Sequence, residues 1–545
     1  MASVCIPYTR VPHATALYLD YLYHFDRVER FYGGSPSELH SFQLVAEKIR
    51  SRQSSRETLV GVLKRQNQHF GCSEETLANI RLLKDPETFA VLTGQQAGLF
   101  SGPAFTLYKA LTTVRLAQHL TQQGLRCVPV FWLATEDHDL EEVLRAAVFD
   151  EDGRLEWLEP PAERPAANSP VGMVKFGEGI IEVLARLQQL LPPGEPSARL
   201  LRDLRECYAP GMKWGDAFGR FMTRLFGRFG VILIDPLDAD LHGEARGIYR
   251  WALGEAASLR QRLLDRSKEL IAAGYHAQVH VGTDSTLLFA SVNGGRQAIR
   301  QQGDQFAADA LPAAPAVQVE QWITERPLDF TPNALLRPVV QDSLLPTVAY
   351  VPGPAELAYF AQSQVIYEEI ERPIPVMFPR AAFTLADRRV ERLLGKYALN
   401  LEDVWRGEEH LRRKIAAAAL TGNGQESWPA RLDRGEQDLR RLFEDIQGDV
   451  ERLDPTLQDA LRHTQEKMVF QLERLRGKLS RAAFDRSEIL RRHEQELLRF
   501  LMPEGHLQER QVSGIYFLGR AGYELLDELF GQVQPNCSNH QFVVY

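Results

Sequence analysis

The stretch that decides the fold is residues 88–134, TFAVLTGQQAGLFSGPAFTLYKALTTVRLAQHLTQQGLRCVPVFWLA. An apolar run at 89–93 leads into a glycine-rich loop at 94–103, and the apolar residues that follow recur every three or four positions up to Leu120. A second apolar run occupies 127–134. Runs that are apolar throughout are typical of parallel strands buried on both faces. The order strand, loop, helix, strand therefore predicts a right-handed βαβ unit.

Further short apolar runs extend this unit into an α/β core over residues 86–385. They predict strands at 230–235, 347–351 and 375–378. The Pro-, Glu- and Arg-rich stretch at about 150–225 separates two of the predicted strands, so we interpret it as an insertion.

A second insertion is predicted at about 277–330. Residues from Gln278 to Ala290 alternate in polarity, and Asn293-Gly294-Gly295 is a turn sequence, which indicates a hairpin. A proline-punctuated stretch completes this insertion.

The two ends of the chain differ from the core in the spacing of their apolar residues. Residues 1–85 have helical spacing and predict a helical lead-in packed on the core. Residues 386–510 are charged and repeat apolar residues at coiled-coil spacing, and 511–545 are expected to return to the core. If 455–500 is one helix behind Pro455, it is roughly 70 Å long. The apolar stripe of such an arm needs a partner: an antiparallel hairpin, a second subunit, or both.

Composition excludes several classes of function. Lys and Arg number 63 against 72 Asp and Glu, a net charge of -9, so nucleic acid is not an expected partner. The five cysteines are scattered without a Cys-x-x-Cys, which argues against a disulfide framework or structural zinc site and favours a reducing cytoplasm. A stretch of about 18 apolar residues does not occur, so we expect neither a membrane span nor a membrane partner.

The glycine-rich loop is the first candidate binding site. It joins a buried strand to a helix with Gly102 as its predicted N-cap and Pro103 as its first residue, a place where free N–H groups favour an anion. Gln95 and Gln96 have amides that both donate and accept hydrogen bonds, which suits a polar ligand. The structural alternative is that the glycines only permit a tight turn.

An acidic cluster follows the second strand of the unit. Glu136-Asp137-His138-Asp139 crowds like charges at the carboxyl edge of a parallel sheet, which calls for a compensating cation, ammonium group or arginine. His138 is suited to proton transfer near neutral pH. The alternative is an acidic helix start capped by Asp139. Histidine spacing does not predict a zinc site.

A third group of polar residues surrounds the predicted strand 347–351. Arg337 can clamp a carboxylate or phosphate, and Glu356 lies in the first turn of a helix behind a Pro-Gly-Pro loop. An ordinary salt bridge is an equally good interpretation. Arg380 ends the last predicted strand, where it either reaches a ligand or is a surface cation.

These motifs, together with Tyr359-Phe360-Ala361 and Leu507-Gln508-Glu509-Arg510, closely resemble the bacillithiol-biosynthesis cysteine-adding enzyme family. The likeness covers nearly the whole chain. It implies a Rossmann-like parallel-sheet core with two connecting-peptide insertions and a coiled-coil domain that forms a homodimer. It also implies a ligase that joins the carboxyl group of cysteine to the amine of glucosaminyl-malate, in the last step of bacillithiol biosynthesis.

From the resemblance and the motifs together, we expect Asp137, His138 and Asp139 to be catalytic. The expected substrate-binding residues are Gln95, Gln96, Gly98, Ser101, Gly102, Arg337, Asp342, Glu356 and Tyr359. The family also binds ADP at the junction of core and coiled coil, apart from the presumed active cleft. By position this implies a nucleotide, ADP or ATP with Mg²⁺ possible, near Arg380, Ala381, Phe383, Thr384, Gln508 and Arg510.

Two other functions stay open at this point. One is a non-catalytic dimeric nucleotide-binding scaffold, whose coiled coil recruits a separate catalyst. The other is a transferase of the nucleotidylyl type with a different amine acceptor.

Overall fold

The computed structural model describes all residues except 1–2, 52–55, 164–167, 310, 420–427 and 536. At its centre is a five-stranded, all-parallel sheet with strand order β15-β14-β2-β3-β8. The predicted strands are confirmed, with bounds β2 (Phe89–Gln95), β3 (Cys127–Leu133), β8 (Ile232–Ile234), β14 (Thr347–Tyr350) and β15 (Val376–Met377). The expected α/β class is therefore correct.

The sequence of strand β2 is apolar throughout because both faces of the strand are buried. Phe89 and Val91 belong to one buried cluster, while Ala90 and Leu92 belong to another, so both faces of the strand are covered. Helix α5 (Phe105–Gln122) connects β2 to β3 and contacts both strands. Its N-cap is Ala104, so the predicted cap at Gly102 was two residues early. The reason is that Phe100 and Ser101 already have positive φ, which places a separate tight turn before the helix.

The N-terminal region is helical as expected, with one exception. Helices α1 (Ala16–Tyr23), α2 (Leu39–Arg50), α3 (Glu57–Phe70) and α4 (Glu74–Leu82) precede the sheet. Ser3–Ile6, however, forms strand β1 and pairs with β17 (His540–Val544). The periodicity of residues 1–85 could not show this, because the strand's partner lies at the other end of the chain.

The first inserted region is mainly helical. It carries the small strands β4 (Ala146–Phe149), β5 (Leu155–Leu158), β6 (Ala162–Glu163) and β7 (Lys175–Phe176), then helices α7 (Gly179–Leu190), α8 (Glu195–Cys207) and α9 (Trp214–Phe226). Trp214 is fully buried at the start of α9, and its indole N–H donates to the carbonyl of Ala97. This region therefore supports the glycine-rich loop from outside.

The second inserted region is a five-stranded antiparallel sheet that follows α10 (Ala239–Gly254) and α11 (Ala256–Ala272). Its order is β12-β11-β10-β9-β13, with bounds β9 (Ser285–Val292), β10 (Gly295–Gln302), β11 (Gln305–Ala308), β12 (Leu311–Pro315) and β13 (Phe330–Pro332). The predicted turn at 293–294 joins β9 to β10, but the strand starts at Ser285 rather than at Gln278. Helix α12 (Ala316–Glu325) leads back to β13.

The remaining helices of the core follow the second insertion. Helix α13 (Arg337–Leu344) lies before β14, and α14 (Pro354–Glu369) lies after it. The short helix α6 (Leu140–Val143) directly follows the acidic cluster. Both α14 and α6 start where a parallel strand ends, so their first turns face the carboxyl edge of the sheet.

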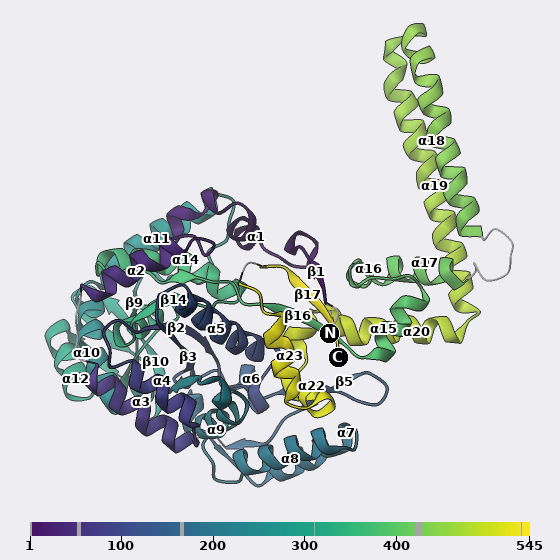
Figure 1. The fold of residues 1–545 in the computed structure, drawn as a ribbon. Coiled ribbons are helices and arrows are strands. Elements are labelled where there is room, and N and C mark those ends of the chain that lie inside the picture. Colours follow the sequence, from purple (N-terminus) through teal and green to yellow (C-terminus); the bar gives the residue numbers. More distant parts are fainter. Residues whose placement is uncertain (1–2, 52–55, 164–167, 310, 420–427, 536) are drawn as a thin grey trace.

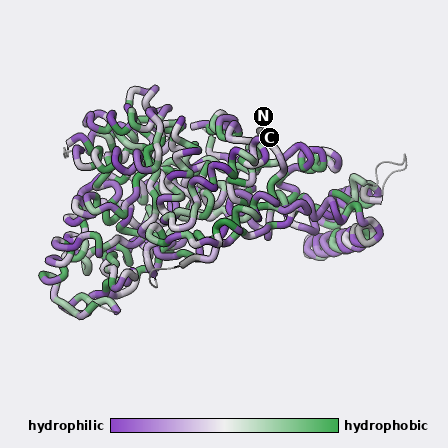
Figure 2. The backbone as a smooth tube through the Cα atoms, turned by 90° about the horizontal axis from the view of Figure 1, so that it is seen from below, coloured by the Kyte–Doolittle hydropathy of each residue, from purple (hydrophilic) through white to green (hydrophobic). Residues whose placement is uncertain are grey.

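The C-terminal region contains an arm that projects from the body (Figure 1). Helices α15 (Arg388–Lys396), α16 (Leu401–Trp405) and α17 (Glu408–Ala419) lead to the arm, which is an antiparallel hairpin of α18 (Trp428–Leu453) and α19 (Gln458–Asp485). Pro455 opens the turn between them, as predicted. Residues 455–500 are not one helix, because α19 ends at Asp485 and Ser487 caps a new helix, α20 (Glu488–Leu501). Hydrophilic residues predominate along the hairpin (Figure 2).

The last segment returns to the core through α21 (Gln508–Gln511), α22 (Gly514–Ala521), α23 (Glu524–Gln532) and β17. Strand β17 lies between β1 and β16 (Ala382–Ala386) in a three-stranded sheet. The two chain ends therefore lie side by side (Figure 1). In the described part of the chain, no helix has the length and apolar character needed to cross a membrane.

Candidate functional site

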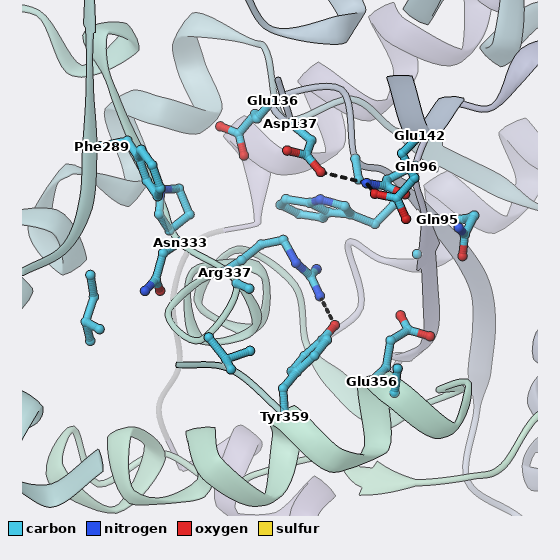
Figure 3. Close-up of a pocket in the computed structure, with 18 of the residues that line it drawn as sticks. Gln95, Gln96, Glu136, Asp137, Glu142, Phe289, Asn333, Arg337, Glu356 and Tyr359 are labelled. Atoms are coloured by element: carbon cyan, nitrogen blue, oxygen red, sulfur yellow. Dashed lines mark hydrogen bonds between the residues drawn. The ribbon is translucent and has the colours of Figure 1, made fainter. Parts of the chain in front are cut away.

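A cavity of about 900 Å³ lies at the carboxyl ends of β2, β3 and β14. The ends of the central strands provide Gln95, Gln96 and Glu136, and the second inserted region contributes Phe289 and Arg296. Figure 3 shows the acids Glu136 and Asp137 with Gln96 on one side and Arg337, Tyr359 and Glu356 on the other. Parallel α/β sheets bind ligands at this edge, so the cavity has the position of an active site.

The glutamine loop and the acidic cluster meet in this cavity. The Gln96 amide nitrogen Nε2 donates to Asp137 Oδ2 and to Glu142 Oε2, at 2.7 Å in both cases. Both donor hydrogens are used by carboxylates, which leaves the amide oxygen of Gln96 as the group available to a ligand. Glu136 is held from behind by the buried His242, with 3.0 Å between its Oε1 and the imidazole Nε2. Although burial lowers the pKa of His242, the hydrogen bond and charge of Glu136 outweigh it and raise that pKa.

Asp137 is the most strongly stabilised carboxylate of the cluster. Burial alone would raise its pKa, but hydrogen bonds from His138 and Gln96 and the charge of Arg296 hold the pKa well below the usual range for an aspartate. Arg296 Nη1 lies 3.7 Å from Asp137 Oδ1, and its guanidinium stacks 4.0 Å from the ring centre of Phe289. Asp137 is therefore an anion at neutral pH and suits recognition of a positively charged group.

The structure places the other two predicted catalytic residues at the edge of the site. The backbone N–H of His138 donates to Asp137 Oδ1 at 2.8 Å, and its ring Nδ1 lies 3.3 Å from Arg296 Nη1. The His138 ring is not part of the cavity wall. Asp139 accepts a hydrogen bond from the backbone N–H of Glu142 at 3.3 Å and caps α6. This is the capping role that the sequence predicts as the alternative to a catalytic role.

Arg337 is a cation of the cavity wall with neutral partners. Its Nη1 donates to Gln341 Oε1 at 2.8 Å and its Nη2 donates to the Tyr359 hydroxyl at 2.7 Å. Among the described residues, Arg337 has no carboxylate within 4.0 Å that would make an ion pair with it. A guanidinium stays charged in proteins, and a desolvated charge is normally paired. Arg337 therefore points to an anionic ligand group.

Lys109 was not predicted from the sequence. Its side chain is only 2% exposed, and its Nζ contacts Glu356 in an ion pair. The same ammonium donates to the Gly94 carbonyl at 2.7 Å and to Gln95 Oε1 at 3.0 Å. Because Lys109 takes the amide oxygen of Gln95, the amide NH₂ remains for a ligand. Burial lowers the pKa of Lys109, and the charge of Glu356 opposes that shift.

Glu356 is the other half of this buried pair. Its Oε1 accepts from the Tyr350 hydroxyl and its Oε2 from the backbone N–H of Gly353, both at 2.7 Å. The sequence signal for Lys109 was a lone lysine inside a helix whose neighbours are all buried. Arg296 gave no such signal, because its strand belongs to an inserted region and reaches the cavity only in the fold.

Four of the predicted binding residues are elsewhere. Gly98, Ser101 and Gly102 form the tight turn before α5 and do not line the cavity. A Cβ on Gly98 would lie 2.7 Å from the Cα of Gly102, so this turn requires glycine there. Asp342 is buried, accepts from the Tyr367 hydroxyl and faces a smaller cavity. Burial raises the pKa of Asp342 to about 6.

The predicted nucleotide residues do not form an open cradle. Arg380 and Arg510 line the same cavity as the acids and amides, so this set is not separate from the cleft. Arg380 is committed to a buried bidentate pair with Glu509, at 2.7 and 2.9 Å. The other four predicted residues do not line the cavity: Ala381, Phe383, Thr384 and Gln508. Within the described ranges, no group of three or more His, Cys, Asp or Glu could hold a metal ion.

Fold and site together define a class: a Rossmann-like α/β protein with a ligand cavity at the strand ends and a helical hairpin arm. The N-terminal Rossmann-like domain of bacillithiol biosynthesis BshC matches residues 1–381, and the C-terminal coiled-coil domain of BshC matches residues 383–545. The chain belongs to the BshC family of bacillithiol biosynthesis. The resemblance stated from the motifs is therefore confirmed.

The similarity to known relatives extends over the full length of this chain. The chain is 37% identical to a protein of Koribacter versatilis and 35% identical to one of Solibacter usitatus, with 100% of both chains covered in each case. It is 33% identical to a protein of Salinibacter ruber, over 97% of this chain and 96% of that protein. Each of the three has the name "Putative cysteine ligase BshC".

Proposed function

We propose that this protein is a cysteine ligase that joins the carboxyl group of cysteine to the amine of glucosaminyl-malate, in the last step of bacillithiol biosynthesis. The observation that carries the proposal is a single cavity with acidic side chains on one wall and, on another, Arg337, which has no ion-pair partner among the described residues. The two substrates together have ammonium and carboxylate groups, which are the charges that these walls complement. The names of the relatives support a cysteine ligase.

The acid wall would hold the amino groups. Asp137 is ionised at neutral pH. Glu136 lines the cavity beside it, and its Oε1 lies 3.0 Å from the imidazole Nε2 of His242. The amide oxygen of Gln96 lies beside them as a neutral acceptor. On the opposite wall, Arg337 and the amide NH₂ of Gln95 would hold a carboxylate, with Tyr359 fixing the guanidinium.

Amide formation makes one C–N bond and breaks the C–O bond of the cysteine carboxyl group. A carboxylate oxygen leaves only after a co-substrate has activated it. We propose that a nucleoside triphosphate is this activator, so that the oxygen leaves as part of a phosphate or of a nucleoside monophosphate. Because most of the predicted nucleotide residues have no access to the cavity, we assign no step to them. We propose that His138 accepts the amine proton through Nε2 at the edge of the cavity, because its Nδ1 already lies 3.3 Å from Arg296 Nη1 and 3.5 Å from Asp137 Oδ1.

The activity can be tested directly. The purified full chain would be incubated with cysteine, glucosaminyl-malate, ATP and Mg²⁺, and the thiol product followed by mass spectrometry. We expect a product whose mass equals both substrates less one water. Glucosamine and other amines in place of glucosaminyl-malate test the transferase alternative. Absence of product under conditions in which authentic bacillithiol survives would overturn the proposal.

His138 has its own test because its ring lies outside the cavity wall. We expect His138→Gln to lose product formation by about 100-fold, the usual contribution of a general base. His463→Gln, on the exposed surface of the arm, is the matched control. A loss of less than about threefold in His138→Gln would move the proton-accepting role to another residue.

A further inference from the structure

Two cysteines from opposite ends of the chain lie next to each other. The Sγ atoms of Cys5 and Cys537 are 3.9 Å apart, although 532 positions separate the residues in the sequence. Cys5 lies in β1 and is exposed, and Cys537 lies between α23 and β17 and is half-buried. Cys127 and Cys207, in contrast, are buried in the core.

The surroundings of the pair allow a bond to form with local movement only. The sulfurs of a disulfide are about 2.05 Å apart, so the two atoms must approach by about 2 Å. Strand β1 is at the edge of the sheet β1-β17-β16, which leaves one side of it unpaired. Cys537 belongs to neither a helix nor a strand. Neither residue has to break a core contact for the sulfurs to meet.

We propose that Cys5 and Cys537 are a dithiol site that low-molecular-weight disulfides oxidise to a disulfide. The thiolate of one cysteine attacks the small disulfide and releases one small thiol. The second cysteine then attacks the mixed disulfide, forms the Cys5–Cys537 bond and releases a second small thiol. One protein disulfide forms, and one small disulfide is reduced to two thiols.

Oxidation would tie the two ends of the protein together. Residues Ser3–Ile6 pair with His540–Val543, and β17 pairs in turn with β16, the strand that follows Arg380. The backbone N–H of Phe383 in β16 donates to Glu509, the partner of Arg380 in the cavity wall. A bond between Cys5 and Cys537 therefore closes nearly the whole chain into a loop and fastens the sheet beside the cavity. A loop of that length strongly restricts the unfolded chain.

The reaction is expected to be slow compared with that of a free cysteine. Burial beside Cys537 raises the pKa of Cys5, which lowers its thiolate fraction at neutral pH.

The experiment uses the reduced full chain and oxidised glutathione as the probe. After incubation, free thiols are blocked with N-ethylmaleimide, and the protein is analysed by intact mass and peptide mapping. We expect the loss of two of the five free thiols, a Cys5–Cys537 linked peptide, and a melting temperature several degrees higher. Cys5→Ser and Cys537→Ser should each abolish the link and the shift, whereas Cys72→Ser, at a half-buried control position, should retain both.

Two results would overturn the proposal. One is the recovery of Cys5 and Cys537 as free thiols after prolonged exposure. The other is separate glutathione adducts on the two cysteines with no link between them. Neither result bears on the ligase activity, because the readouts are chemical and thermal.

Discussion

Apolar side chains are buried on the core helix α5, whereas many of them are exposed on the arm hairpin of α18 and α19. Twelve residues of α5 are buried, including a lysine. On the hairpin, Phe443 is buried, but other large apolar residues are exposed: Leu442, Leu453, Met468, Phe470 and Leu475. The core helix is covered by its own chain, whereas part of the arm's apolar surface has no cover from the residues that the structure describes. We propose that a second copy covers it, giving the homodimer.

Charged residues show the same contrast. The Arg380–Glu509 pair is 3% and 2% exposed and joins the core to the C-terminal segment. The Arg462–Asp459 pair on the arm is 61% and 81% exposed. Buried pairs are costly to break, while exposed pairs contribute little. The core should therefore be sensitive to single charge changes and the arm should not.

The largest expected effect comes from breaking the buried pair. Arg380→Met would leave the Glu509 carboxylate buried without its cation and should lower the free energy of unfolding by about 3–5 kcal/mol. Arg462→Met on the arm is the matched control and should leave it unchanged within error. Urea unfolding followed by circular dichroism measures both. Equal effects would mean that the core and the arm do not differ in this respect.

The next effect extends the contrast to function. Asp137→Asn removes the ionised carboxylate of the cavity and should reduce product formation by about 100-fold, because the site loses its preorganised negative charge. Asp139→Asn keeps the helix cap, because Asn caps a helix about as well as Asp does, and should change product formation by less than about threefold. Product is measured by mass spectrometry, with circular dichroism to verify folding. The assignment of the acid wall fails if both variants behave alike.

A third effect is a pH dependence that only the buried acids produce. The pKa of Asp342 is raised to about 6, so the folded state keeps this proton longer than the unfolded state does. Its contribution to stability is therefore present below about pH 4 and is lost as pH rises through 6. Asp342→Asn should remove this loss, on the order of 2 kcal/mol.

The measurement is the melting temperature of wild type and Asp342→Asn between about pH 4.5 and 7.5. The variant should gain on the wild type as pH rises. Asp459→Asn on the arm should run parallel to the wild type throughout. A constant gap between wild type and Asp342→Asn would contradict the buried-acid explanation.

The smallest expected effect on stability comes from the arm. Replacing Phe470 and Leu475 by Ser should change the stability of the folded chain little, because both side chains are already exposed. The change should instead shift the protein from dimer to monomer in sedimentation experiments. Val317, an exposed apolar residue of the core surface, is the control for a Ser substitution. An unchanged mass in solution would mean that these arm residues do not contribute to dimerisation.

Much of the core could be predicted because its signals are local. The strands β2 and β3 are apolar runs bounded by turn residues, and the hairpin arm has coiled-coil spacing with Pro455 at its turn. The proximity of Gln96 and Asp137 followed from two neighbouring parallel strands, whose carboxyl ends share one edge of the sheet.

The rest depends on contacts that local patterns do not contain. Strand β1 is four residues long and is paired with β17 at the far end of the chain. Arg296 reaches Asp137 from an inserted sheet, and Glu509 reaches Arg380 from the C-terminal segment. Gly98, Ser101 and Gly102 of the glycine-rich loop do not line the cavity, which the sequence could not show, because a tight turn and an anion site share the same glycine-rich sequence.

The central claim is that Arg337 and the acid wall form one substrate cavity. Its most direct test is the affinity for glucosaminyl-malate, measured by titration calorimetry on wild type, Arg337→Met and the surface control Arg250→Met. We predict that Arg337→Met weakens binding by about 10- to 100-fold, the value of a charge-assisted hydrogen bond to a carboxylate, and that Arg250→Met binds like the wild type. Equal affinity in all three proteins would contradict the account.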